Sequence, residues 1–89
     1  MALLLIGYDL NKAKNYDDLY EAIKGLGTWW HHLDSTWLVK TSVSASDALD
    51  QLEKLMDADD ELLVVDVTRS PAAWRGFNER GNGWLSTAW

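Results

Sequence analysis

The chain contains no cysteine and a single proline, and it has fewer basic than acidic residues. Without cysteine it forms neither disulfides nor thiolate metal sites, and a reducing cytoplasm is the expected location. Eight lysines and arginines against fourteen acidic residues give a formal net charge of −6 at pH 7. Because nonspecific nucleic-acid binding requires a basic face that releases counterions from phosphates, this charge disfavours a general DNA- or RNA-binding protein.

Long apolar runs are also missing from the sequence. The chain begins with MALLLIGYDL, which lacks a basic segment and soon reaches Asp9, so it is too short for a signal peptide or a membrane span. Internal repeats, a G-x-S-x-G elbow, a phosphate-binding P-loop and a G-x-G-x-x-G fingerprint are absent too. We therefore expect one domain without membrane association and without any of these catalytic or nucleotide motifs.

Tryptophan, in contrast, is abundant, with six residues among 89. Three of them and both histidines of the chain fall within GTWWHHLDSTWLVK, residues 27–40. Each large aromatic side chain buries about 150–250 Å², so a few of them supply a core that a small chain otherwise lacks. This stretch is either a binding site or the core of a hairpin, and the choice between them depends on the fold.

The spacing of apolar residues predicts an α+β protein of the ferredoxin-like class, with the order strand, helix, strand, strand, helix, strand. Such a fold has a four-stranded antiparallel sheet with two helices on one face. The predicted strands cover residues 2–9, 28–33, 36–42 and 62–68, and the predicted helices cover residues 15–26 and 45–57. A polar loop over 11–15 and a solvated acidic loop over 57–61 complete the connections.

Local signals support both predicted helices. Asn15 is a candidate N-cap of the first helix, and Ser44 with Asp47 resembles a capping box at the start of the second. The second helix is expected to bury one apolar stripe, which comprises Ala48, Leu49, Leu52, Leu55 and Met56.

Residues 70–89 form an aromatic C-terminal extension of the predicted domain, which covers residues 1–69. The extension carries four large aromatic residues, Trp74, Phe77, Trp84 and Trp89. A flexible tail rarely holds so many aromatic residues, and the two predicted helices leave one face of the sheet open. We expect the extension to pack on that face or on a second subunit. We favour a homodimer, because exposed apolar patches of this size usually mark an interface.

Period-two alternation divides the hairpin between the two faces of the sheet if Asp34 and Ser35 form its turn. The expected helix-covered face carries Trp30, His32, Trp37 and Val39. The expected outer face carries Trp29, His31, Leu38 and Lys40. Since the two adjacent histidines then point in opposite directions, a zinc site that uses both is not expected.

On the expected outer face, Trp29, His31 and Lys40 allow two interpretations. Aromatic residues on an open sheet stack nucleic-acid bases in common RNA-binding domains. The same residue types also suit a dimer interface, where tryptophan is enriched and lysine lies at the rim. The acidity of the chain favours the dimer interface.

Asp9 ends the first strand and is the candidate for metal chemistry. A lone carboxylate in this place is commonly a turn former or an acceptor for a helix cap. As a magnesium ligand Asp9 needs partners, because Mg²⁺ takes six oxygen ligands, and a two-fold axis near the strand end supplies a second copy. Asp66, in the last strand, is either a further acid or the polar residue of an edge strand.

The segments LLLIGYDL and GLGTWWHHLDSTWLVKT resemble the small CRISPR-associated ferredoxin-fold proteins that accompany the integrase in spacer acquisition. The chain is also similar in plan to the virulence-associated protein D family. The resemblance extends over roughly residues 3–68 and implies a prokaryotic or phage protein, although the first helix lacks the arginines that often accompany the motif.

The resemblance also implies roles for particular residues. Asp9 matches the proposed metal-binding acid of the superfamily, Tyr8 is its neighbour, and the acids of two subunits face each other across the dimer. Ser35 and Trp37 match the serine and the aromatic residue with which the third strand of the family begins.

Two functions are compatible with these residues. The preferred one is a cytoplasmic homodimeric binding module, without a cofactor, that engages a protein partner or a small nucleotide through an aromatic face of Tyr8, Trp29, His31 and Lys40. The alternative is an endonuclease that hydrolyses RNA or DNA phosphodiesters, with Asp9 of each subunit as the catalytic ligand of Mg²⁺ or Mn²⁺.

Overall fold

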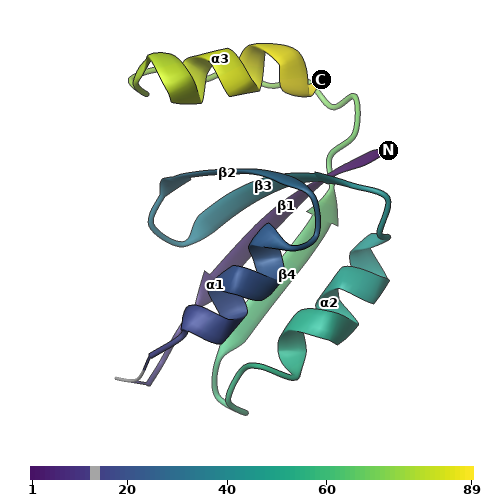
Figure 1. The fold of residues 1–89 in the computed structure, drawn as a ribbon, viewed down its shortest axis with the longest axis vertical. Helices are drawn as coiled ribbons and strands as arrows, with labels where there is room; N and C mark the ends of the chain where they lie inside the picture. The colour runs from purple at the N-terminus through teal and green to yellow at the C-terminus, as the bar shows by residue number, and fades with distance from the viewer. Residues whose placement is uncertain (13–14) are drawn as a thin grey trace.

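The computed structural model describes residues 1–12 and 15–89 and confirms the ferredoxin-like α+β fold (Figure 1). Residues 13 and 14 of the predicted polar loop lie outside the described residues. The elements are β1 (Ala2–Asp9), α1 (Asp17–Lys24), β2 (Thr28–Leu33), β3 (Thr36–Thr41), α2 (Ala45–Glu53), β4 (Glu61–Asp66) and α3 (Glu79–Ala88). The four strands form one antiparallel sheet in the order β2-β3-β1-β4. No helix within the described part of the chain is long and apolar enough to cross a membrane.

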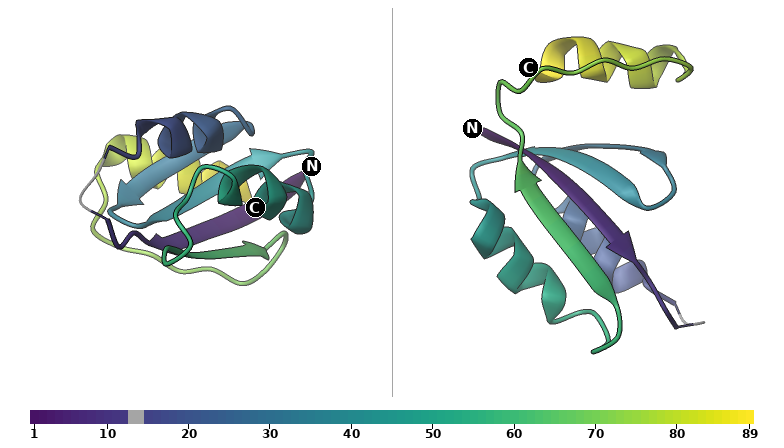
Figure 2. Two further views of the ribbon diagram at one scale, coloured as in Figure 1. Left: turned by 90° about the horizontal axis from the view of Figure 1, so that it is seen from below. Right: turned by 180° about the vertical axis from the view of Figure 1, so that it is seen from behind.

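Helices α1 and α2 cover one face of the sheet, whereas α3 lies across the opposite face, over β2 and β3 (Figures 1 and 2). The two ends of the chain lie near the same end of the sheet (Figure 2). The C-terminal extension therefore folds back onto the sheet of its own chain. The lower part of β4 extends beyond the area that α3 covers (Figure 1).

The sheet carries a hydrophobic core on each face. The central strands β1 and β3 are buried on both sides, which explains the continuous apolar run of β1. The core on the side of α1 and α2 comprises Leu4, Ile6, Tyr16, Leu19, Ile23, Trp37, Val39, Ala48 and Leu52. The core beneath α3 comprises Leu3, Trp30, Leu38, Leu85 and Ala88.

The helix starts follow the predicted capping signals in part. The Ser44 hydroxyl accepts a hydrogen bond from the Asp47 N–H over 3.2 Å, which confirms this cap of α2. At α1 the Asn15 side chain accepts a hydrogen bond from the Asp17 N–H, but the N-cap position itself belongs to Tyr16. Helix α2 ends at Glu53, earlier than predicted, so the placing of Leu55 in its buried stripe is wrong.

Helix α3 begins at an N-cap that the sequence contains but the sequence analysis missed. The Asn78 side chain accepts a hydrogen bond from the Gly81 N–H over 2.8 Å. Glycines 81 and 83 disfavour a helix on propensity alone, and tertiary packing overrides that preference. A Cβ at Gly81 would lie 3.1 Å from the Phe77 Cβ and 3.3 Å from the His32 ring, so glycine lets α3 approach the hairpin closely.

A β-bulge in β2 determines where the aromatic residues of the hairpin point. The turn at Asp34 and Ser35 pairs Leu33 with Thr36, as predicted, but the next regular pair is Trp30 with Leu38. The ladder thus advances three residues along β2 and two along β3. One extra residue in β2 moves every side chain of the strand on the N-terminal side of the bulge to the face opposite the one that a regular ladder would give it.

The predicted faces of four hairpin residues are therefore wrong. Trp30 and His32 lie on the α3 side, where the Trp30 ring contacts Phe77 edge-on, with centroids 4.8 Å apart. Trp29 and His31 lie on the side of α1 and α2. The predicted faces in β3 are correct, because the strand itself contains no extra residue: Trp37 and Val39 face the helix-side core, while Leu38 and Lys40 face α3. The two histidines still point in opposite directions.

Leu85→Ala tests whether α3 belongs to the folded core. Leu85 is 3% exposed, so its truncation should lower the free energy of unfolding by about 2–5 kcal/mol. Leu55→Ala is the matched control, because Leu55 is 38% exposed and its loss should cost less than about 1 kcal/mol. Urea denaturation followed by tryptophan fluorescence measures both values. Equally small losses in the two variants would contradict the packing of α3 on the sheet.

Candidate binding surfaces

Trp37 is the centre of an aromatic cluster on the helix side of the sheet. The His31 ring stacks on the buried Trp37 indole, with ring centroids 3.7 Å apart and an interplanar angle of 9°. The rings of Trp29 and Tyr20 approach the same indole to centroid distances of 5.5 and 6.3 Å. Trp29 stays exposed at the rim, and Lys24 Nζ lies 5.1 Å from its ring centroid. The cluster fixes the orientation of the β2 rings.

Hydrogen bonds connect this cluster to the hairpin turn. Trp37 Nε1 donates to the Tyr8 hydroxyl over 3.0 Å, and this hydroxyl donates to the Asp34 carbonyl over 3.3 Å. His31 Nε2 donates to the same carbonyl over 3.1 Å. Burial raises the pKa of Tyr8 above its ordinary value, although the hydrogen bond from Trp37 lowers it. Tyr8 is therefore a structural link between β1, β3 and the turn.

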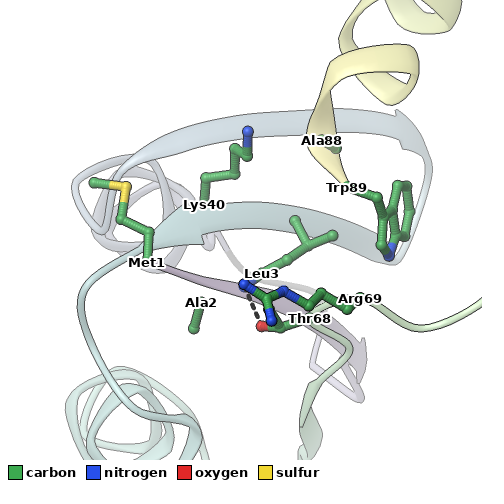
Figure 3. A pocket seen from close by; sticks show the side chains of 8 residues that line it. All are labelled: Met1, Ala2, Leu3, Lys40, Thr68, Arg69, Ala88 and Trp89. Atoms are coloured by element: carbon green, nitrogen blue, oxygen red, sulfur yellow. Dashed lines mark hydrogen bonds between the residues drawn. The ribbon is translucent and has the colours of Figure 1, made fainter.

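Lys40 belongs to a different surface from the other predicted binding residues. Its side chain rises from β3 toward the end of α3, and its Nζ donates to the Thr87 carbonyl over 3.0 Å (Figure 3). A cation at a helix C-terminus stabilises the unpaired carbonyls there. The adjoining pocket, about 250 Å³ in volume, lies between β1, β3, the turn after β4 and the end of α3 (Figure 3). Lys40 thus fastens α3 to the sheet from the expected outer face. The other three members of the predicted binding face, Tyr8, Trp29 and His31, lie on the side of α1 and α2, so the four residues do not share one face.

A groove of about 530 Å³ follows the open edge of β2. Its lining comes from β2 and the first turns of α3, and comprises Gly27, Thr28, Trp29, Trp30, His31, His32, Arg80 and Trp84. Glycine is required where the groove begins, because a Cβ at Gly27 would lie 1.9 Å from the Lys40 carbonyl oxygen. Arg80 contributes a positive charge, and no carboxylate of the described residues lines the groove. We call this region the β2 groove.

The opposite edge of the sheet, β4, presents aliphatic side chains to solvent. Leu63 and Val65 are 59% and 39% exposed. They share the face of the sheet that α3 covers elsewhere, since they pair with Gly7 and Leu5 in the ladder with β1. This ladder runs without a register shift over its described length. The two edges of the sheet thus differ in chemistry, one aromatic and cationic, the other aliphatic.

Asp9 is exposed at the end of β1, directly opposite Glu61 of β4 in the ladder. The two carboxylates share a face at this end of the sheet, since directly opposite residues in an antiparallel ladder do so. Among residues 1–12 and 15–89, no group of three or more His, Cys, Asp or Glu side chains is arranged to hold a metal ion. Asp66 is separate from this pair: hydrogen bonds from the Thr68 hydroxyl and N–H lower the pKa of its carboxyl below the ordinary value.

The structure thus brings together three of the predicted site residues, Tyr8, Trp29 and His31, around the Trp37 indole. It separates Lys40 from them and places Asp9 at another end of the sheet. Sequence reasoning missed Arg80 and Trp84, because they line the β2 groove only through the packing of α3. Their four-residue spacing, one helical turn, was the available signal.

The fold and the two open edges define a ferredoxin-like α+β domain with an added C-terminal helix. The chain matches no protein-family model, no curated protein and no solved structure. Its function is therefore argued from the chemistry of its own surfaces.

Tyr8→Phe tests the hydrogen bond that joins Tyr8 to the aromatic cluster. At neutral pH the change leaves the buried Trp37 Nε1 without this acceptor, which should cost about 1–3 kcal/mol of unfolding free energy. Because the pKa of Tyr8 is raised in the folded state, its contribution is complete below the unfolded value of about 10 and is lost as the pH rises through the folded pKa.

The difference between wild type and Tyr8→Phe should therefore stay constant from about pH 7 to 9 and shrink at higher pH. Urea denaturation at several pH values measures this difference. Titration of the other tyrosines changes the unfolding free energy of both proteins equally and therefore cancels in the difference. A difference that grows above pH 10 would show that the sign of the Tyr8 shift is wrong.

Proposed function

We propose that the protein is a homodimeric binding module in which two copies join through β4 and the β2 groove remains open for a protein partner. The observation that carries the proposal is the exposure of Leu63 and Val65 on an edge strand without a bulge. Exposed aliphatic edge strands pair readily with another chain unless charges, prolines or bulges interrupt them. In β4 the charges are confined to the two end residues, Glu61 and Asp66.

The backbone of β4 has a definite set of open hydrogen-bonding groups. The Val67 N–H donates to the Leu3 carbonyl over 2.8 Å, so the backbone of Val67 faces β1. Because this direction alternates along an antiparallel strand, every second residue back from Val67 faces β1 as well. The residues whose N–H and C=O groups point away from the sheet are therefore Leu62, Val64 and Asp66.

This outward set is symmetric about Val64, as a two-fold axis requires. An antiparallel pair of β4 strands centred on Val64 uses all three outward residues, and it places Leu63 of each copy beside Val65 of the other. Directly opposed like charges are avoided in this register. A pair centred on Leu63 would instead oppose Asp60 of one copy to Asp66 of the other, which is destabilising.

The β2 edge is less suited to a second copy. The bulge between Trp30 and Leu33 interrupts the regular ladder that a symmetric strand pair needs. A symmetric pair at this edge would also bring the positive charge of Arg80 from both copies to the same interface. The β2 groove is therefore the better site for a partner of different chemistry.

Single cysteines test the dimer, because the chain has no native cysteine. In the proposed register Val64 faces its own copy at a Cα separation of about 5.5 Å, within the range that a disulfide spans. Val64→Cys should therefore form a disulfide-linked dimer under mild oxidation. Leu62→Cys is the matched control. In this register the two Leu62 positions are offset by four residues along the strands, about 13 Å, so the variant should stay largely unlinked.

Analytical ultracentrifugation of the cysteine-free protein completes this test. Wild type should sediment as a dimer that Leu63→Lys weakens at least about tenfold, while Leu55→Lys leaves it unchanged. A wild type that remains monomeric would overturn the dimer. Open-ended growth beyond two copies would also overturn it, because only a head-to-tail contact continues in this way.

A second candidate function is divalent-metal-dependent phosphodiester hydrolysis at Asp9. It is supported by the ladder position of Asp9 opposite Glu61, which places two carboxylates at one exposed end of the sheet. A dimer centred on Val64 separates the two copies of Asp9 by more than about 20 Å, since Asp9 lies level with Glu61, three residues along the strand from the axis. The proposed β4 dimer and an ion shared by two Asp9 carboxylates are therefore mutually exclusive.

Asp9→Asn tests this second candidate. The amide keeps the shape of the side chain but removes the charge that would hold Mg²⁺ or Mn²⁺. If Asp9 is catalytic, cleavage of short single-stranded RNA or duplex DNA should be lost while the melting temperature changes little. Asp47→Asn, at the exposed start of α2, is a control purified in parallel against contaminating nuclease. Cleavage that survives in Asp9→Asn, or none in wild type, would exclude catalysis at Asp9.

A further inference from the structure

The β2 groove has the geometry of a strand-addition site. It lies between an open edge strand and a helix, and it is continuous from Gly27 to His32. We propose that it binds an extended, acidic segment of a protein partner, which pairs with β2 as a fifth strand of the sheet. This inference rests on the proposed function, because it requires the β2 edge to stay free when two copies associate.

The backbone of β2 offers hydrogen bonds to such a segment. Tyr8 N–H donates to the Ser35 carbonyl, so this alternate set of β1 residues faces β3. Following the alternation through the ladders, Thr28 and Trp30 face β3, and the N–H and C=O of Trp29 point to the open edge. An added strand gains affinity from such main-chain bonds and specificity from the side chains on either side.

The two sides of the groove provide unlike contacts for alternate side chains of the added strand. On the α3 side, Arg80 and Trp84 lie one helical turn apart and form the wall together with His32. On the other side, the exposed Trp29 ring is flanked by Lys24. Since side chains of a strand alternate between faces, one set meets the wall with Arg80 and the other set meets Trp29.

Charge identifies the acidic character of the partner. Arg80 lines the groove and no carboxylate of the described residues does, so the groove is locally cationic although the whole chain carries a net charge of −6. Lys24 at the far side is paired with Glu21 at 3.5 Å, so Arg80 is the main positive group that faces an added strand. Acidic side chains on the α3 side of the strand therefore gain an ion pair, and aliphatic or aromatic side chains on the other side gain contact with Trp29.

Selection from a library of random dodecapeptides displayed on phage, with the full wild-type chain as bait, tests the proposal. Enriched peptides should contain glutamate or aspartate alternating with β-branched or aromatic residues. Arg80→Glu should weaken the selected peptides at least about tenfold in fluorescence anisotropy, because the ion pair becomes a like-charge contact. Arg75→Glu is the matched control, an exposed arginine outside the groove, and should change the affinity less than about twofold.

Backbone N-methylation of the best peptide tests strand addition itself. Methylation at alternate positions should abolish binding when the affected N–H faces β2 and should be tolerated when it faces solvent. Peptides that are basic, that bind Arg80→Glu as well as wild type, or that tolerate every N-methylation would overturn the proposal, and so would a library that yields no binder. Displacement of the selected peptide by AMP or UMP at micromolar concentration would assign the groove to a small nucleotide instead and would also overturn it.

The same peptide separates this inference from the proposed dimer. Leu63→Lys should bind the peptide as tightly as wild type does, because its substitution lies on the other edge of the sheet. If wild type proves monomeric but the peptide results hold, the dimer fails and the groove assignment stands. If the β4 disulfide forms but no acidic peptide binds, the groove assignment fails alone.

Discussion

The extra residue in β2 is the constraint on which the rest of the structure depends. Because the ladder advances three residues in β2 against two in β3, Trp29 and His31 turn toward α1 while Trp30 and His32 turn toward α3. His31 then stacks on Trp37 and reinforces the helix-side core. Trp30 becomes the centre of a second core, and its Nε1 donates to the Gly81 carbonyl of α3 over 3.2 Å. Without the bulge, both tryptophans would exchange faces and α3 would lose its main anchor.

The docking of α3 in turn makes the two edges of the sheet different. On the β2 side, α3 adds a wall with Arg80 and Trp84 and converts an edge strand into a groove. On the β4 side the helix is absent, and Leu63 and Val65 remain exposed on a regular strand. One edge thus offers symmetric aliphatic contacts, and the other offers a cationic, aromatic slot. A sheet with two unlike edges can associate with its own copy and with a different partner at the same time.

The sequence predicted the fold well because its signals are local. The apolar run of β1, the helical spacing before Gly25 and the Ser44 cap each depend on neighbours in the chain. The bulge was not predictable in the same way, since alternation alone assumes a regular ladder, and a shift of one residue reverses every face. The role of Lys40 as a contact to α3 was hidden for a related reason: α3 contains two glycines, so the helix that Lys40 meets was not recognised.

The central claim is that β4 is covered by a second copy and that β2 is open in the free protein. Residue-level amide hydrogen exchange at rising protein concentration tests it most directly, since exchange reports whether each backbone N–H is bonded or free. We predict that the outward amides of Leu62, Val64 and Asp66 become more protected as the protein associates, whereas the outward amide of Trp29 exchanges fast at every concentration. Protection that rises at Trp29 with concentration, while the β4 amides stay unprotected, would contradict the account.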